Sequence, residues 1–376
     1  MAGLSAENKL RYIYNMRVVS HLAKRIKIKY PAFDESGFCH TIEAKLETLG
    51  FGERERLIRD ALKKYLPKDF KRSAHILIDS LEPALGLEPG KTDWDSFIVI
   101  PLTEFIADAG IDHFSLSMKT LYEMTKRSSS EWAIRSFIKK YPEKSFALFE
   151  KWTADKNPHV RRLVSECTRP RLPLTARLRR FQKNPKPVLA LLESLKDDEE
   201  LYVRRSVANN LNDISRDNPE IVIETLKRWL RGASIERRWI VRHALRTLFK
   251  QGDKKALALL GYLSPKISRV KLKLKSKRVP GEGNLSFHFL FLSDKSQKLM
   301  IDYRIHFMKS NGKLAPKTFK LTIKNPECGD KISISKTHSF KSLSTRKHYA
   351  GKHEVELIVN GAPVAQTNFT YTGGGL

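Results

Sequence analysis

The stretch YVRRSVANNLNDISRDNP, residues 202–219, decides the fold class, because its pattern occurs again elsewhere in the chain. Its apolar residues recur at three- and four-residue spacing, which is the period of an amphipathic helix. It ends on Asn218-Pro219, and Asn-Pro also occurs at 157–158 and 184–185. Asparagine is a good N-cap and proline is tolerated in the first turn, so each pair predicts the start of a helix.

The helices predicted between residues 131 and 263 form two alternating sets. One set is rich in leucine, and the other carries an arginine in the same position of each helix. The arginine-bearing helices are EWAIRSFIKK, HVRRLVSECT, YVRRSVANNL and WIVRHALRTL, aligned on Arg135, Arg162, Arg205 and Arg242. Helical pairs that repeat in this way indicate a HEAT-like solenoid. One helix set of such a stack lines the concave face, and we expect it to be the arginine-bearing set.

The pattern changes near residue 265, where helical spacing gives way to alternation. Seven short strands with turn signals such as PGEGN, SNGK and VNGAP between them are predicted in the remaining residues. This number of strands in about 100 residues is typical of an immunoglobulin-like sandwich. We therefore expect a mainly α chain, with a HEAT-like α-solenoid at 1–265 followed by a small all-β immunoglobulin-like domain at 266–376.

The charge of the chain indicates a polyanionic partner. The sequence has 70 Lys and Arg against 41 Asp and Glu, a formal charge of +29, and nucleic acid is the commonest partner of so basic a protein. An apolar run of transmembrane length is missing, so we expect no membrane partner. The N-terminus lacks the apolar core of a signal peptide, which predicts an intracellular chain.

Metal and cofactor chemistry have no support in the sequence. Cys39, Cys167 and Cys328 lie far apart without CxxC spacing, which argues against a disulfide framework or a zinc site. The eleven histidines show no HExxH or paired spacing. We expect no metal and no cofactor.

The aligned arginines predict a cationic track for a nucleic-acid backbone, because phosphates lie closely spaced along a duplex. Ordinary solvated side chains are the alternative, but solubility does not require the arginines to be in register. In the β domain, alternate lysines of VKLKLKS would lie on one face of a strand. The predicted DNA-binding residues are Arg135, Arg162, Arg169, Arg205, Arg242, Arg246, Lys271, Lys273 and Lys275.

Carboxylates are predicted on the same faces of the helices as these arginines. Glu166 follows Arg162 by four residues, Asp213 follows Arg205 by eight, and Glu131 opens the helix that carries Arg135. Steps of four residues stay on one side of a helix. The carboxylates either form intrahelical salt bridges, worth a few tenths of a kcal/mol, or act on a cationic substrate. Sequence physics alone leaves both interpretations open.

The stretches SEWAIRSFI, NPHVRRLVSECTRPRLP, YVRRSVANNLNDISRDNPE and RWIVRHALRTL resemble the AlkC group of DNA alkylation-repair glycosylases, which are relatives of AlkD. The resemblance covers residues 1 to about 265, and some members of that group carry a C-terminal immunoglobulin-like domain. It implies excision of cationic N3-methylated bases, chiefly 3-methyladenine and also 3-methylcytosine, from duplex DNA without a deep base-flipping pocket. It places catalytic acids at Glu131, Glu166 and Asp213, and it implies a monomer in the bacterial cytoplasm, at the nucleoid.

The sequence departs from this group at Leu174, where RPRLPL stands in place of the RPRLPW that we expect. We therefore expect Trp132 or Trp152 to supply the packing contact with the lesion or its sugar. A non-catalytic HEAT-repeat scaffold that binds DNA or RNA is the alternative function. It would need the arginine track but not the recurring carboxylates.

Overall fold

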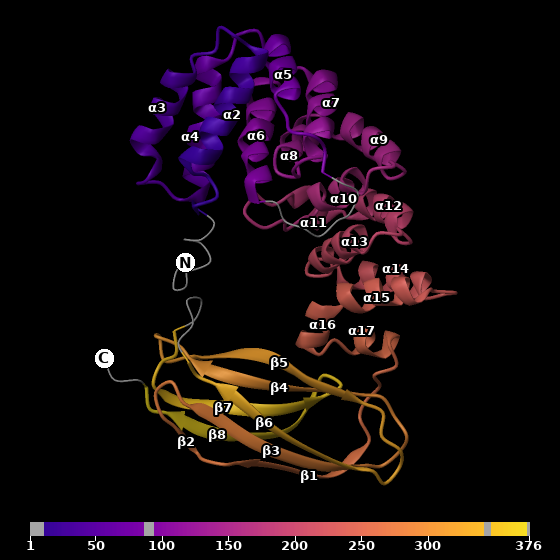
Figure 1. Ribbon diagram of the computed structural model, residues 1–376. Helices are drawn as coiled ribbons and strands as arrows, with labels where there is room; N and C mark the ends of the chain where they lie inside the picture. Colours follow the sequence, from indigo (N-terminus) through magenta and orange to yellow (C-terminus); the bar gives the residue numbers. More distant parts are fainter. Residues whose placement is uncertain (1–10, 86–93, 342–346, 374–376) are drawn as a thin grey trace. The chain divides into compact units, whose positions relative to one another are not determined.

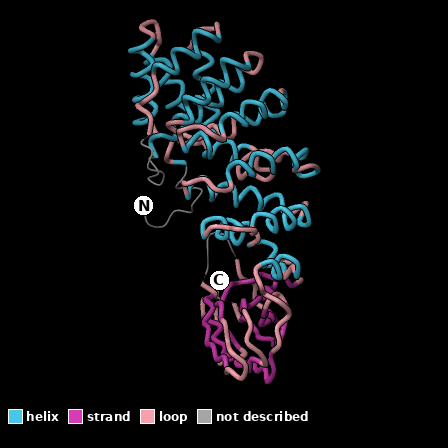
Figure 2. Tube along the Cα trace, turned by 90° about the vertical axis from the view of Figure 1, so that its right-hand side faces the viewer, coloured by secondary structure: helices cyan, strands magenta, loops and turns pink. Residues whose placement is uncertain are grey.

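The computed structural model describes residues 11–85, 94–341 and 347–373. Helices make up the first part of the chain and strands the last part (Figures 1 and 2), which confirms the predicted fold class. The chain divides into two compact units, residues 1–218 with 233–244, and residues 219–232 with 245–376. The predicted domain boundary after residue 265 falls in the connection between the last helix and the first strand, and it stays a prediction.

The helices follow one another along the first part of the chain. Their bounds are α2 (Met16–Lys29), α3 (Glu35–Leu46), α4 (Phe51–Tyr65), α5 (Phe70–Asp79), the 3-10 helix η1 (Trp94–Ile98), α6 (Val99–Ala109), α7 (Phe114–Thr125), α8 (Ile134–Lys140), α9 (Pro142–Trp152), α10 (Pro158–Cys167), α11 (Arg179–Lys183), α12 (Lys186–Leu195), α13 (Leu201–Ile214), α14 (Pro219–Trp229), α15 (Ile235–Ala244), α16 (Arg246–Gln251) and α17 (Lys254–Leu259). Among the residues described, no helix is long and apolar enough to cross a membrane.

The Asn-Pro pairs mark helix starts, but by different contacts. The side chain of Asn157 accepts a hydrogen bond from the His159 N–H at 2.9 Å, which caps α10. Asn184 accepts from Lys186 at 3.2 Å, at the start of α12. The amide of Asn218 instead donates to the carbonyl of Gln182 at 2.7 Å. Each pair therefore stands at the start of a helix, and the Asn218 amide in addition binds the start of α14 to α11.

Three of the four arginine-bearing helices lie side by side in the first unit, with α13 packed between α10 and α15. Val203, Val207 and Leu211 give α13 its buried face at four-residue spacing. The predicted helix WIVRHALRTL is broken, since α15 ends at Ala244 and α16 begins at Arg246. Arg246 therefore does not continue the stripe of α15.

The second unit contains two facing sheets. The strands are β1 (Ile267–Leu274), β2 (Arg278–Val279), β3 (Asn284–Ser293), β4 (Leu299–Met308), β5 (Leu314–Lys324), β6 (Lys331–Ser339), β7 (Gly351–Val359) and β8 (Ala362–Tyr371). One sheet has the order β1-β3-β6 and the other β2-β8-β7-β4-β5. All pairs are antiparallel except β2 with β8. Aromatic and aliphatic side chains of both sheets, such as Phe289, Ile305 and Val355, form the core between them.

A close backbone approach fixes the β7–β8 hairpin against the last helices of this unit. Asn360 and Gly361 both have positive φ, 47° and 78°, as the two-residue turn of a tight hairpin requires. A Cβ atom placed on Gly252, just after α16, would lie 2.7 Å from the carbonyl oxygen of Gly361. Glycine is needed at this contact because a side chain would force the two segments apart.

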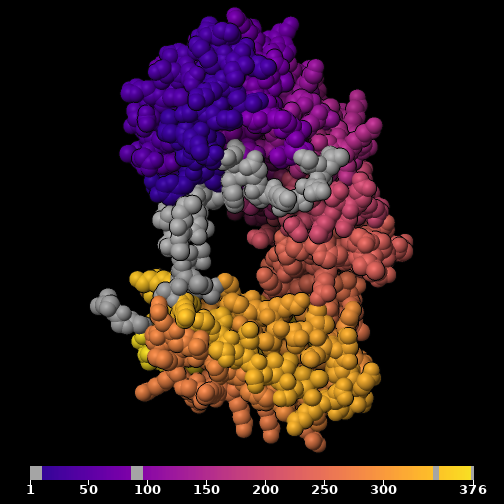
Figure 3. Space-filling model, viewed as in Figure 1, coloured from indigo at the N-terminus to yellow at the C-terminus, as the bar shows by residue number. Residues whose placement is uncertain are grey.

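The lysine alternation in β1 is confirmed. Lys271 and Lys273 are exposed, whereas Leu272 and Leu274 pack against the core. Within the described part of the chain, β1 lies at an edge of its sheet and pairs with β3 alone. Figure 3 shows long side chains from the orange part of the chain, which includes β1, projecting from the surface.

Candidate functional site

Three carboxylates from three segments meet around two guanidinium groups in the first unit. Glu131 lies in the turn before α8, Glu166 in α10 and Asp213 in the last turn of α13. Nη1 of Arg162 lies 2.6 Å from Oε2 of Glu131, and its Nη2 lies 3.5 Å from Oε1 of Glu166. The structure therefore brings together all three predicted catalytic residues.

Arg169 joins the other side of this cluster. Its Nη1 donates to Oε1 of Glu166 at 2.5 Å, and its Nε donates to Oδ2 of Asp213 at 2.9 Å. Glu166 and Asp213 are each only 5% exposed, so these ion pairs are shielded from water. Asp213 pairs with Arg169 from the neighbouring segment rather than with Arg205 of its own helix, as its spacing had suggested.

Two serines that sequence reasoning did not single out orient the carboxylates. Oγ of Ser206 donates to Oε2 of Glu166 at 2.5 Å, and Oγ of Ser129 donates to Oε2 of Glu131 at 2.7 Å. The ring of Tyr202 lies 5.2 Å from the guanidinium carbon of Arg162. Tyr202 and Ser206 are four residues apart on α13 and therefore lie on one face of the helix. This spacing is the sequence signal from which their shared position at the site could have been predicted.

The cluster concentrates buried charges of both signs. Glu131, Glu166 and Asp213 face the cations of Arg162 and Arg169, and the charges of Arg135 and Arg216 also act on Asp213. Burial would raise the pKa of Glu166, but Arg162 and Arg169 together hold it below its usual value. Burial raises the pKa of Asp213, although its hydrogen bond with Arg169 opposes the rise. A cation placed here would therefore stabilise the ionised form of Asp213.

The predicted contact between Arg135 and DNA is wrong in this structure. Arg135 is 2% exposed, and its guanidinium donates to the carbonyls of Cys167, Arg169 and Ala176 at 3.0, 2.8 and 2.6 Å. Burial lowers its pKa to about 10. Its position in the aligned helices predicted an exposed side chain beside the other arginines. The segment that follows α10 covers this side chain instead.

The remaining arginines of the track differ in their surroundings. Arg205 on α13 and Arg242 on α15 are exposed, as phosphate contacts require. Arg246 is half-buried and lies on α16, in the second unit. Arg161, which directly precedes Arg162 on α10, forms a buried ion pair with Asp198 at 2.6 Å. Of the aligned set, Arg205 and Arg242 are therefore the exposed members.

The aromatic side chains near the cluster are not equivalent. Trp132 is half-buried, with its ring edge-on to Phe51 at a centroid distance of 6.5 Å. Trp152 is buried, and its ring packs against Tyr122 and Phe149. Leu174 is 74% exposed. Trp152 therefore belongs to the core, and Trp132 is the tryptophan that can contact a substrate.

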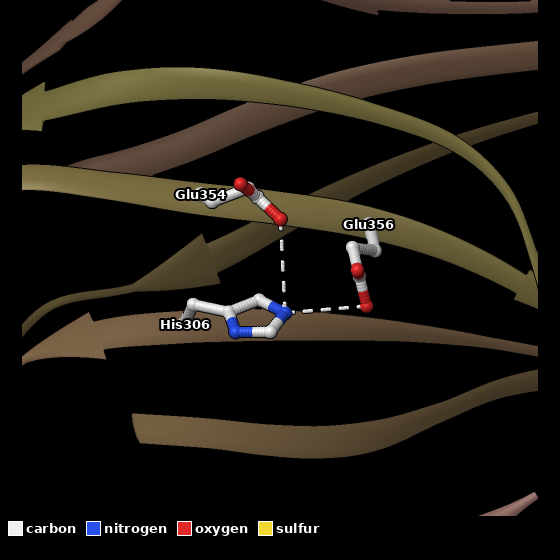
Figure 4. A group of neighbouring side chains, drawn as sticks. All are labelled: His306, Glu354 and Glu356. Atoms are coloured by element: carbon white, nitrogen blue, oxygen red, sulfur yellow. Dashed lines mark ion pairs between the residues drawn. The ribbon is translucent and has the colours of Figure 1, made fainter. Parts of the chain in front are cut away.

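A second group of ligating side chains lies on β4 and β7, on the sheet face opposite to the core (Figure 4). Nε2 of His306 lies 3.2 Å from Oε2 of Glu356 and 3.8 Å from Oε1 of Glu354. Nη1 of Arg304 donates to the same Glu356 oxygen at 3.2 Å. Glu356 is therefore shared between Arg304 and His306 across the two strands.

The comparisons with known proteins agree with this architecture. A family described as "DNA alkylation repair enzyme" matches residues 124–248, the range that contains all three carboxylates. The chain is 39% identical over 354 residues to the uncharacterised protein YhaZ of Bacillus subtilis, which covers 94% of this chain and 96% of YhaZ. Residues 268–373 match the family described as the C-terminal Ig-like domain of YhaZ.

The structure of the Pseudomonas fluorescens alkylpurine DNA glycosylase AlkC, bound to DNA containing an abasic-site analogue, matches with a TM-score of 0.88. The two chains are 34% identical, and the match covers 97% of this chain and 99% of the other. The chain belongs to the AlkC-type DNA alkylation-repair family. The AlkC-type fold and the strand-rich C-terminal domain that the sequence predicted are thereby confirmed.

Proposed function

We propose that this AlkC-type protein is a DNA glycosylase that removes cationic N3-alkylated bases, chiefly 3-methyladenine and also 3-methylcytosine, from duplex DNA. The observation that carries the proposal is the buried cluster of three carboxylates from three segments, held by Arg162 and Arg169. A scaffold that only bound phosphates would not need buried carboxylates beside its arginines. Similarity to an alkylpurine DNA glycosylase supports the same reaction class.

The residues suit a substrate that is already positively charged. When the bond from C1′ of the sugar to the ring nitrogen breaks, its electron pair neutralises the base, so no strong general acid is needed. The sugar then resembles an oxocarbenium ion, which carboxylates stabilise in glycoside hydrolysis. Water adds to C1′, and its proton passes to a carboxylate or to solvent. This chemistry requires no metal or cofactor.

Asp213 is the principal stabiliser in this proposal, with Glu166 and Glu131 in support. The ion pair with Arg169 uses Oδ2 of Asp213, and we assign Oδ1 to the sugar or the attacking water. Glu166 lies between Arg162 and Arg169, which neutralise much of its charge. Glu131 shares Arg162 and is held by Ser129.

The exposed cations position the duplex. Arg205 and Arg242 in the first unit, and Lys271, Lys273 and Lys275 in the second, are the residues that we assign to phosphates. Residues 266–376 carry 21 Lys and Arg against 7 Asp and Glu, so the β domain adds a large part of the attraction for DNA. Arg162 and Arg169 act at the lesion, because their side chains hold the carboxylates. We further propose a monomer that works at the bacterial nucleoid.

Base release from N-methylated duplex DNA tests this proposal. The full-length protein is expected to release 3-methyladenine, and Glu131→Gln is expected to slow the release. Asp198→Asn is a matched control, because Asp198 is also buried and paired with an arginine, Arg161, but lies outside the cluster. Binding of duplex or RNA without any base release would show that the chain is a non-catalytic scaffold.

A further inference from the structure

The group formed by His306, Glu354 and Glu356 on the five-stranded sheet has the composition of a metal site. His306 lies on β4 directly opposite Glu354 of β7, and Glu356 is the next residue of β7 on the same face. One imidazole nitrogen and two carboxylate oxygens are ligands that divalent transition-metal ions, zinc among them, take in proteins. The group therefore offers three ligands from two neighbouring strands.

The distances within the group fit a single ion. Nε2 of His306 lies 3.2 Å from Oε2 of Glu356 and 3.8 Å from Oε1 of Glu354. The three side chains each have a ligand atom within 4.8 Å of the other two. Zinc binds nitrogen and oxygen ligands at about 2.1 Å, so tetrahedral geometry separates two ligand atoms by about 3.4 Å. The two nitrogen–oxygen distances lie on either side of this value.

The ring nitrogen at the centre of the group is unsatisfied. Among the described residues, Nε2 of His306 is buried and has no hydrogen-bond partner, although two carboxylate oxygens lie within 3.8 Å of it. Figure 4 shows both carboxylate groups turned toward this nitrogen. Buried polar atoms in native proteins nearly always have a partner. A cation between the three side chains would satisfy the nitrogen and both carboxylates at once.

The surroundings of the group favour a cation more than the rest of the β domain does. Residues 266–376 carry 7 Asp and Glu against 21 Lys and Arg, yet two of these seven acids converge on one histidine. The residues directly opposite the group on β5 and β8 are uncharged, namely Pro316, Gln366 and Asn368. The group is therefore a local concentration of negative charge on a basic domain.

Arg304 holds Glu356 in place and leaves it able to bind a metal ion. Its Nη1 donates to Oε2 of Glu356 at 3.2 Å, and its Nε donates to Oγ1 of Thr318 at 3.1 Å. A carboxylate oxygen has two lone pairs, so Oε2 can accept from the guanidinium and ligate an ion together. Hydrogen-bonded partners of this kind orient the ligands of protein metal sites. Arg304 is therefore a positioning residue for Glu356.

We propose that His306, Glu354 and Glu356 bind one Zn²⁺ ion, which joins β4 to β7 on the outer face of the β domain. Three protein ligands leave a fourth coordination position for water. Both strands lie inside the sheet order β2-β8-β7-β4-β5, so the ion would stabilise the centre of this sheet. It takes no part in the proposed base release. The sequence predicted no metal because the ligands come from strands that are far apart in the chain.

Titration of the full-length, chelator-treated protein with Zn²⁺ tests the proposal. The wild type should bind one ion per chain at this site, and Mg²⁺, which prefers oxygen ligands, should not displace it. His306→Gln, Glu354→Gln and Glu356→Gln should each weaken zinc binding by at least about tenfold, since loss of an outer-shell partner alone costs that much. Glu356→Gln keeps an acceptor for Arg304, so the fold should survive.

Two further measurements place the ion. Co²⁺ in place of Zn²⁺ should give visible absorption bands in the wild type that disappear in His306→Gln. Zinc should slow amide hydrogen exchange in β4 and β7 of the wild type but not of Glu354→Gln, because an ion bound to the folded state suppresses local opening.

His288→Gln is the matched control. His288 is a half-buried histidine of the same domain, but it lies on β3 of the other sheet and contacts Oγ of Ser335 at 3.0 Å. This variant should keep the wild-type zinc affinity and Co²⁺ spectrum.

A wild type that binds no Zn²⁺ would show that the group forms ion pairs only, and would overturn the inference. Wild-type zinc affinity in all three ligand variants would place the ion elsewhere and would overturn it as well. The titration contains no DNA, so neither result bears on the proposed base release.

Discussion

Replacing Asp213 by asparagine keeps the shape of the side chain and removes one of the three negative charges around Arg162 and Arg169. An oxocarbenium-like sugar then loses the carboxylate charge that would stabilise it most. Losing one preorganised electrostatic group costs about 3 kcal/mol in comparable sites. We therefore expect 3-methyladenine release to fall by at least about a hundredfold.

Folding should survive this change. The asparagine carbonyl can still accept from Nε of Arg169, which also keeps its bond to Glu166. Because burial raises the pKa of Asp213, its charge is not a source of stability. DNA affinity should hold or rise, since a negative charge near the phosphates is removed.

The assay is single-turnover release of 3-methyladenine from a methylated duplex, with affinity measured separately by fluorescence anisotropy. Asp217→Asn is the matched control. Asp217 lies four residues further along, is paired with Arg171 at 2.6 Å at the surface, and should keep the wild-type rate. An Asp213→Asn variant that excises at the wild-type rate would refute the mechanism.

Three other perturbations test the surface lysines, a buried arginine and the charge of Asp213. Changing Lys271, Lys273 and Lys275 to glutamine should weaken DNA binding. It should also reduce the slope of log affinity against log salt concentration by about 2.7, which is about 0.9 for each phosphate that is no longer neutralised. An unchanged slope in binding titrations from about 50 to 200 mM salt would leave these lysines without a role in binding. Arg135→Met should lower the free energy of unfolding by on the order of 3 kcal/mol, because three buried carbonyls lose their donor. A thermal midpoint equal to that of the wild type would argue against a stabilising role for Arg135. The rate of base release should fall as the pH is lowered through the raised pKa of Asp213, because the protonated acid carries no charge, and a rate that stays constant down to pH 4 would contradict that dependence.

Much of the fold could be predicted because it depends on local periodicity. Three- and four-residue spacing located the helices, and alternation in the last hundred residues located the strands, including the lysine face of β1. The break between α15 and α16 was missed, since WIVRHALRTL keeps apolar spacing across it. Spacing reports which residues share a face, and does not report where the backbone ends one helix and starts another.

The site was predicted in its residues but not in its pairing. The spacing of Glu166 from Arg162 correctly indicated an ion pair within α10. Arg169 binds Glu166 nearby and Asp213 44 residues further along the chain, and no local pattern contains the second contact. Arg135 was misplaced for the same reason, because its helical register is right while its burial depends on the segment after α10. Contacts between distant segments depend on how the whole repeat packs, and local spacing does not show this packing.

The most direct test of the central claim compares base release by the full-length protein from duplexes carrying 3-methyladenine, 3-methylcytosine, uracil or hypoxanthine. The carboxylate cluster can stabilise the sugar cation, but the proposed mechanism supplies no acid to activate a neutral leaving base. We therefore predict release of the cationic bases and retention of uracil and hypoxanthine. Efficient excision of uracil, or no release of 3-methyladenine, would contradict the account.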